Sequence, residues 1–215
     1  MLREIDLNEI SDGKLYGAND LVKAGCNDCV GCSACCRGMG DSIILDPLDI
    51  HNLTTGLGKT FEELLEEHIA LRVVDGLILP HLKMAGTEEK CSFLNDEGRC
   101  VIHAFRPGFC RLFPLGRVYD EEGFHYFLQV NECQYKNRTK VKVKKWIDVP
   151  ELARYEQFVK DWHFFQKEWQ NELNGCEDLE ARKKVSMLIL REFYQKPYGQ
   201  EDFYGEFNRR LKEFP

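Results

Sequence analysis

Residues 26–36 read Cys-Asn-Asp-Cys-Val-Gly-Cys-Ser-Ala-Cys-Cys and carry five thiols within eleven positions. The repeated two-residue gap lets both thiolates of a pair turn onto one metal, because the intervening turn also offers N–H groups to the sulfurs. Cys35 and Cys36 are adjacent, so in an extended segment their side chains point to opposite sides. In that conformation, we expect them to serve two metal centres or to join one multinuclear cluster.

Four further cysteines follow, and Cys91 and Cys100 end a segment that is predicted to form a hairpin. Its central residues, Asn95 to Gly98, are typical of a turn between closely spaced strand ends. Nine thiols therefore gather in the N-terminal part, and two tetrahedral centres without shared ligands would use eight. The candidate metal ligands are Cys26, Cys29, Cys32, Cys35, Cys36, Cys91, Cys100, Cys110 and Cys133.

Metal binding accounts for these cysteines better than burial, disulfide bonding or redox exchange does. Buried free cysteines do not cluster at this density. A disulfide framework needs an oxidising compartment and would leave an odd thiol among the nine. Thiol redox exchange through a C-x-x-C pair lacks its usual strand–motif–helix context here. Because soft thiolate donors select zinc or iron ahead of copper, we expect zinc or iron, the iron as ions or as an iron–sulfur cluster.

The composition is that of an ordinary globular protein, with 215 residues, 43% hydrophobic and 30% charged. No apolar run approaches the roughly 18 to 20 residues of a membrane span. The first residues, Met1 to Asp6, lack the features of a secretory signal, so we expect a cytoplasmic protein without a membrane partner. The formal net charge of −7 argues against nucleic-acid binding by the whole chain.

Cysteines and helical periodicity divide the chain into two predicted parts. Residues 1–145 are expected to form a cysteine-rich metal-binding domain, and residues 146–215 a helical C-terminal extension packed on it. The expected fold class is α+β, with small antiparallel β-hairpins and loops around a cysteine-ligated metal centre and amphipathic C-terminal helices. The first of these helices carries an apolar stripe that we interpret as core packing rather than a cofactor box. The stripe comprises Leu152, Tyr155, Phe158, Val159, Trp162, Phe165, Trp169 and Leu173.

Local signals predict further elements. In the C-terminal part, Gly175 is expected to end the first helix, and two more are predicted over about 179–193 and 201–211. In the N-terminal part, Asp46-Pro47 predicts a helix start, and the capping box that begins at Thr60 predicts a helix through about Ala70. Strands are predicted in 73–79 and as a pair in 115–130.

Arginines near the cysteines are expected to offset the negative charge of metal-bound thiolates. The expected compensators are Arg37, Arg99, Arg106, Arg111 and Arg117. His103 is interpreted as a packed ring in preference to an imidazole ligand.

Residues 136–145 form a run with six bases and no acid, interrupted by Val141 and Val143. One interpretation is a strip that binds an anion or the backbone of RNA. We favour an edge strand whose lysines face solvent and block aggregation while both valines face inward. A nucleic-acid partner is therefore the weaker prediction.

The ordered combination of motifs resembles a known family. Cys29-x-x-Cys32-x-x-Cys35-Cys36 is followed by Cys91-Ser92-Phe93-Leu94, by Cys100-Val101-Ile102-His103 and by Arg-Pro-Gly-Phe-Cys-Arg-Leu-Phe-Pro at 106–114. Between Cys26 and Cys133 the chain thus resembles the YkgJ-type family, the CxxCxxCC group of zinc- or iron-chelating proteins. The resemblance implies ligand roles for Cys29, Cys32, Cys35, Cys36, Cys91, Cys100 and Cys110, with Cys133 as an eighth. Cys26 precedes the usual motif of the family.

Three functions are consistent with these features. The first is a metal-binding protein that chelates zinc or iron through clustered cysteine thiolates. The second is an iron–sulfur enzyme or electron carrier, and the third is an interaction protein that binds RNA or another anion and holds structural zinc. Metal ions are the predicted partners. The sequence leaves open whether the chain is an enzyme and which protein it contacts.

Overall fold

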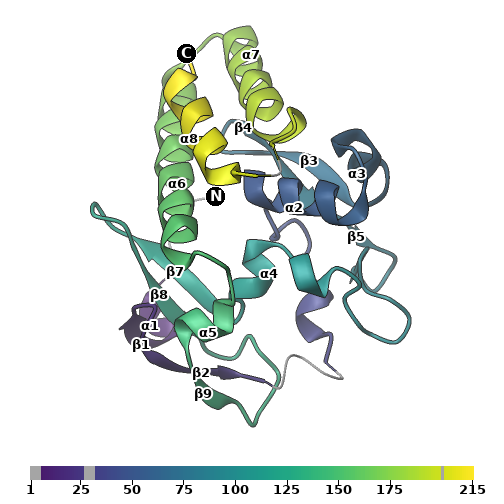
Figure 1. Ribbon diagram of the computed structural model, residues 1–215, viewed down its shortest axis with the longest axis vertical. Coiled ribbons are helices and arrows are strands. Elements are labelled where there is room, and N and C mark those ends of the chain that lie inside the picture. Colours follow the sequence, from purple (N-terminus) through teal and green to yellow (C-terminus); the bar gives the residue numbers. More distant parts are fainter. Residues whose placement is uncertain (1–5, 27–31, 200) are drawn as a thin grey trace.

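The computed structural model describes residues 6–26, 32–199 and 201–215, and it shows a mixed α+β fold of helices and small antiparallel sheets (Figure 1). The strands are β1 (Ser11–Tyr16), β2 (Leu21–Gly25), β3 (Ile69–Val74), β4 (Leu77–Leu82), β5 (Met84–Ala85), β6 (Lys90–Cys91), β7 (Leu115–Tyr119), β8 (Phe124–Gln129) and β9 (Thr139–Lys142). The α-helices are α1 (Leu7–Ile10), α2 (Pro47–Leu57), α3 (Phe61–Glu67), α4 (Gly108–Leu112), α5 (Val143–Ile147), α6 (Leu152–Gly175), α7 (Leu179–Leu190) and α8 (Phe203–Glu213). Short 3-10 turns form η2 (Ala34–Cys36) and η3 (His103–Phe105), and a π-helical turn forms η4 (Arg191–Gln195).

The sheets bring distant parts of the chain together. A three-stranded antiparallel sheet has the order β1-β8-β7, and the other strands form the pairs β2-β9, β3-β4 and β5-β6. In the pair β2-β9, Gly25 lies opposite Thr139. Because Cys26 follows β2 directly and Cys133 shortly precedes β9, this pairing holds the two ends of the cysteine-bearing segment side by side.

Two helix starts in the N-terminal part are confirmed. Asp46 caps α2, where its side chain accepts a hydrogen bond from the Asp49 N–H at 2.8 Å, and Pro47 occupies the first turn. Thr60 and Glu63 form the predicted capping box of α3. The predicted end near Ala70 is wrong, because α3 ends at Glu67 and the next residues form β3.

The strand predicted over 73–79 is also wrong, because the middle of this segment is a turn. Val74 of β3 pairs with Leu77 of β4, and Asp75 and Gly76 join the two strands. Both turn residues have positive φ, 49° and 89°. Asp-Gly is a typical two-residue hairpin connection, so the turn signal was present in the sequence.

Two hairpins were predicted near the cysteines, one within 115–130 and one from Cys91 to Cys100, and the structure confirms the first and corrects the second. The strand pair predicted within 115–130 is present as β7 and β8. The segment from Cys91 to Cys100 turns as predicted, with the Gly98 N–H donating to the Asn95 carbonyl at 3.1 Å, but it carries no regular ladder. Leu94 and Cys100 form an isolated bridge, and β6 pairs with β5 instead.

The three C-terminal helices are confirmed. The apolar stripe of α6 is packed in the core, with Tyr155, Phe158 and Trp162 buried. Asp178 caps α7 by accepting from the N–H groups of Glu180 and Ala181. Beyond Leu190 the helix continues as the π-helical turn η4.

One continuous core joins the two predicted parts of the chain. Its buried residues come from both sides of residue 145, for example Leu64 and Leu79 on one side and Phe193 and Phe207 on the other. Figure 1 shows α6, α7 and α8 together at one end of the molecule, with β3 and β4 beside them. The Ile78 N–H donates to the Ser186 hydroxyl at 2.6 Å across this boundary. The domain division at residue 145 stays a prediction.

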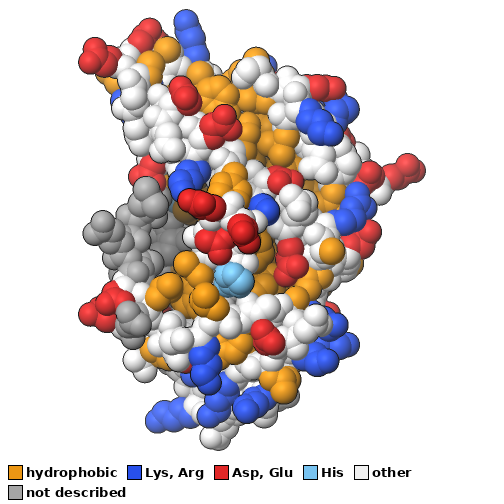
Figure 2. Space-filling model, turned by 90° about the vertical axis from the view of Figure 1, so that its left-hand side faces the viewer, with side chains coloured by type: hydrophobic (Ala, Val, Ile, Leu, Met, Phe, Trp, Pro, Cys, Tyr) orange, Lys and Arg blue, Asp and Glu red, His pale blue; other side chains and the backbone are white. Residues whose placement is uncertain are grey.

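The basic run at 136–145 forms the end of a strand and the start of a helix. In β9, which pairs with β2, the Lys140 and Lys142 side chains are exposed. Val143 is fully buried but begins α5 rather than continuing the strand, so the edge-strand interpretation holds for residues 139–142. Figure 2 shows Lys and Arg side chains gathered at the lower end of the molecule, where Figure 1 places β2 and β9.

Candidate metal centre

Four cysteines from four separate segments line one cleft. They are Cys35 on η2, Cys91 at the end of β6, Cys100 after the turn at Gly98, and Cys110 on α4; we call them the first thiol group. The cleft encloses about 950 Å³ of space, part of it open to solvent, and Cys32 and Cys36 also border it. All four thiols of the first thiol group are free of disulfides. The structure places these four predicted ligands on one cleft, and their role as ligands stays a prediction.

The thiols of the first thiol group interact electrostatically. Burial raises the pKa of Cys110 well above its usual value, and the charges of Cys91, Asp49 and Cys35 raise it further. For Cys35, a hydrogen bond with Cys36 is the largest cause of a raised pKa, followed by burial, whereas the charge of Arg106 opposes the rise. Packing four ionisable thiols into one partly buried cleft disfavours their charged form unless a cation accompanies them.

Backbone N–H groups are directed at two of these sulfurs. Burial raises the pKa of Cys91 and Cys100, and hydrogen bonds from the backbone of Phe93 and Ile102 partly offset the rise. In both cases the donor lies two residues after the cysteine. Such donors stabilise a thiolate, and they are the outer contacts that hold a metal-bound cysteine in place.

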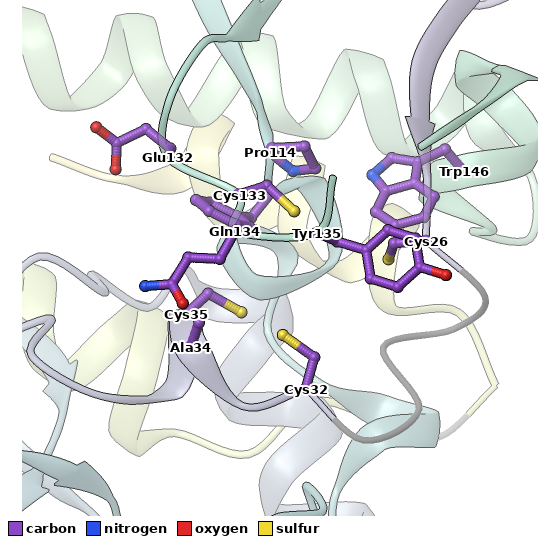
Figure 3. Close-up of a pocket in the computed structure, with 11 residues that line it drawn as sticks. Cys26, Cys32, Ala34, Cys35, Pro114, Glu132, Cys133, Gln134, Tyr135 and Trp146 are labelled. Carbon is purple, nitrogen blue, oxygen red and sulfur yellow. The ribbon is translucent and has the colours of Figure 1, made fainter. Parts of the chain in front are cut away.

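A second thiol group lies beside the first and comprises the described cysteines Cys26, Cys32 and Cys133. These residues line a smaller pocket of about 360 Å³, together with Cys35 and Tyr135. Figure 3 shows the sulfur atoms of Cys32, Cys35 and Cys133 pointing into a common space, with the Glu132 carboxylate turned away from it.

Cys35 lines the pockets of both thiol groups, whereas the thiol charges that act on Cys133 come from Cys26 and Cys32. Burial raises the pKa of Cys133, the backbone N–H of Tyr135 and the charge of Arg138 oppose the rise, and the charges of Cys26 and Cys32 add to it. Cys133 thus repeats the N–H···S arrangement of Cys91 and Cys100. Cys29, the remaining predicted ligand of the C-x-x-C run, lies outside the described residues.

The donor chemistry of both groups fits a soft metal, but the side chains are not yet arranged around one. Within residues 6–26, 32–199 and 201–215, no three His, Cys, Asp or Glu side chains form a group that could hold a metal ion. Thiolates are ligands that suit zinc and iron, and hydrogen-bond donors around the sulfurs support metal-bound thiolates. In the described part of the chain, the thiols of each group therefore line a common pocket without forming a coordination sphere.

Of the five arginines predicted to offset thiolate charge, two act on the first thiol group. The charge of Arg106 lowers the pKa of Cys35 and Cys100, and that of Arg99 lowers the pKa of Cys100. The other three have different contacts. Arg37 pairs with Glu88, Arg111 donates to the Ala104 and Asp148 carbonyls, and Arg117 donates to the Tyr155 hydroxyl.

His103 contacts Arg106, whose Nη1 lies 2.9 Å from its Nδ1. The ring also lines the cleft of the first thiol group. Two aromatic residues, Phe113 and Trp146, line both pockets, a position that the sequence predicted for neither. Phe113 belongs to the motif at 106–114, but its place beside Trp146 arises from the packing of α4 against α5, where the Trp146 Nε1–H donates to the Leu112 carbonyl at 3.2 Å.

A family model matches residues 28–139, just over half of the chain. Its description is CxxCxxCC, a "Putative zinc- or iron-chelating domain". The chain belongs to the CxxCxxCC family. The family segment contains all of the first thiol group, and Cys26 lies just before it. No curated protein and no solved structure matches this CxxCxxCC chain.

In the described part of the chain, no helix has both the length and the apolar character needed to cross a bilayer.

Proposed function

We propose that this CxxCxxCC chain binds zinc or iron through two groups of cysteine thiolates. The first thiol group supplies Cys35, Cys91, Cys100 and Cys110, and the second supplies Cys26, Cys32 and Cys133. The observation that carries the proposal is the convergence of four thiols from four separate segments on one cleft. Membership of a family described as zinc- or iron-chelating supports it independently.

Charge and hydrogen bonding both favour a bound cation. A divalent cation among the thiolates of the first thiol group would offset both the burial and the neighbouring negative charges that raise the pKa of Cys110. The backbone N–H groups of Phe93 and Ile102 would then spread the remaining negative charge. Arg106, which lines the cleft, would contribute in the same way.

Metal binding would also stabilise the fold around the cleft. The chain from Met84 to Leu112 contains the two-residue strands β5 and β6, the 3-10 turn η3 and the five-residue helix α4. Such short elements contribute little stability of their own, so cross-linking Cys91, Cys100 and Cys110 through one metal centre adds to the free energy of folding.

An iron–sulfur cluster is the alternative occupant, because four cysteine thiolates are the ligand set of both a zinc ion and a cluster. An iron–sulfur enzyme or an electron carrier would follow from this alternative, because zinc undergoes no redox change. Acid-labile sulfide distinguishes the two, since a cluster contains it and a zinc site does not.

The test is elemental analysis of iron, zinc and sulfide in the full chain, purified without oxygen and compared with three variants. We expect bound metal in the unaltered protein and a partial loss in both C91S/C100S and C26S/C133S, because each double variant disables one thiol group. C176S is the matched control, since Cys176 follows α6 and lines neither cysteine pocket.

Two results would contradict the proposal. One is an unaltered protein that remains free of zinc and iron after anaerobic reconstitution with either metal. The other is metal content that is equal in the unaltered protein, C91S/C100S and C26S/C133S.

A further inference from the structure

The start of helix α4, which carries Cys110, is held by a buried carboxylate from a distant part of the chain. The backbone N–H of Gly108 donates to Asp49 Oδ1 at 2.7 Å, across 59 positions of sequence. Asp49 is 4% exposed. The N-cap residue of α4, Pro107, contributes no side-chain cap, so Asp49 supplies the cap that the local sequence lacks.

Asp49 itself is fixed by α2. Its Oδ2 accepts from the Asp46 N–H at 3.1 Å, and the Asp46 side chain accepts from the Asp49 N–H at 2.8 Å. This reciprocal capping box leaves the Asp49 side chain little freedom to rotate. One carboxylate therefore ties the N-terminal turn of α2 to that of α4.

The Tyr155 side chain also lies against Gly108. A Cβ atom at this position would lie 2.7 Å from Tyr155 Oη and 3.7 Å from Asp49 Oδ1. Tyr155 is buried on α6, and its hydroxyl accepts a hydrogen bond from Arg117 Nη2 at 2.9 Å. Any side chain at Gly108 would therefore push α4 away from Tyr155 or displace the tyrosine.

We propose that Asp49 and Tyr155 are positioning residues for Cys110, and that they set where α4 delivers this thiol to the first thiol group. Cys110 lies two residues after Gly108 within a helix of five residues. A displacement of the backbone at Gly108 would therefore also move the Cys110 thiol. This inference rests on the proposed function, because it assigns to the contacts a role in metal binding beyond packing.

The test is titration of the metal-stripped, reduced full chain with Co²⁺ without oxygen. Two quantities are read: the intensity of the thiolate-to-cobalt charge-transfer absorption, which rises with the number of Co–S bonds, and the affinity measured against a competing chelator. C110S gives the reference for a centre that lacks this thiol.

We expect D49A and G108A to resemble C110S, with weaker charge-transfer absorption and about 10-fold lower affinity for cobalt. D49N keeps Oδ1 as an acceptor for the Gly108 N–H, so it should bind cobalt much as the unaltered protein does. In G108A/Y155F, the Tyr155 hydroxyl that obstructs the added methyl is absent. Cobalt binding in this double variant should therefore return to the level of Y155F alone.

Two controls separate positioning from general stability. D178A removes a helix cap at α7, remote from the cleft, and G175A adds a methyl at a glycine with nothing within 4 Å of the new Cβ. Both should bind cobalt as the unaltered protein does, even where D178A lowers the melting temperature.

The outcomes distinguish the inference from the proposed function. If the unaltered chain gives no thiolate–cobalt absorption, the proposed function fails. If the unaltered chain binds cobalt and D49A and G108A match it in absorption and affinity, the positioning role is overturned. If D49A does not fold, the variants at Gly108 decide the question. Cobalt binding that stays weaker in G108A/Y155F than in Y155F would overturn the positioning role.

Discussion

The rings of Tyr119 and His163 are stacked nearly parallel, with centroids 3.5 Å apart and an interplanar angle of 8°. Tyr119 ends strand β7 and His163 lies on helix α6, so the contact joins the three-stranded sheet to the C-terminal helices. Burial lowers the pKa of His163 to about 4, and the charge of Lys167 adds to the effect. The folded protein therefore holds this imidazole neutral.

The lowered pKa of His163 predicts that the free energy of unfolding depends on pH. Unfolded, His163 titrates near its ordinary pKa of about 6.5. Between about pH 6.5 and pH 4, the unfolded state therefore binds a proton that the folded state does not. We expect the free energy of unfolding to fall as pH drops through this window.

The measurement is urea unfolding of the unaltered protein and of H163F at several values between pH 7 and pH 4. H163F should lose part of the decline that the unaltered protein shows. H125Q, at a half-exposed histidine on β8, is the control and should keep it. Identical pH profiles for H163F and the unaltered protein would refute the role of His163.

Cys35 and Cys36 are predicted to differ in metal binding although they are neighbours. The pKa values of Cys91, Cys100 and Cys110 all respond to the charge of Cys35. Cys36 instead forms a hydrogen bond with Cys35 and thereby raises the pKa of Cys35. We expect C35S to lose metal from the first thiol group and C36S to keep it, with metal per chain as the readout. The reverse pattern would assign the ligand role to Cys36.

Removal of metal is predicted to loosen one region selectively. Chelation should increase amide hydrogen exchange from Met84 to Leu112, where the regular elements are short, more than in α6. Under the proposed function a bound metal would contribute to folding, so the melting temperature should fall as well. If complete removal of metal changed neither the amide exchange rates from Met84 to Leu112 nor the melting temperature, the metal would have no structural role.

A buried arginine near the C-terminus is predicted to tolerate no replacement by lysine. Arg210 is 4% exposed and donates to the carbonyls of Glu192, Lys196 and Pro197 and to the Glu206 carboxylate. Lysine has fewer donors and no planar fork, so R210K leaves some of these partly buried carbonyls without a side-chain partner. We expect a loss of about 3 kcal/mol in the free energy of unfolding.

The matched control for R210K is R209K. Arg209 is the neighbouring residue, but it is exposed and pairs with Glu213 at 2.8 Å. Chemical denaturation should show a change of less than about 0.5 kcal/mol for R209K. Equal losses for the two variants would contradict the role assigned to Arg210.

The elements that could be predicted from the sequence are those that local chemistry specifies. Asp46 and Pro47 start α2, and Thr60 starts α3, because capping involves residues within one turn. The apolar stripe of α6 is likewise a local period. The misplaced strand at 73–79 came from overlooking Asp75-Gly76, a turn signal that was also local.

The arrangement of the candidate site could not be predicted, because it depends on contacts between distant residues. Cys32 and Cys35 are three positions apart, yet their electrostatic partners belong to different thiol groups. Asp49 looks in the sequence like an ordinary member of a capping box. Its bond to Gly108 across 59 positions follows from how α2 and α4 pack, which no local motif encodes.

The pairing of Gly25 with Thr139 has a consequence for how the family segment is joined to its flanks. Both covalent connections of residues 26–138 to the rest of the chain lie where β2 and β9 pair, so changes in the length of the internal loops need not separate β2 from β9. If this segment were placed in another protein, strands equivalent to β2 and β9 would make both of its covalent connections. That protein must further supply β1, which pairs with β8, and a helical cover for the shared core.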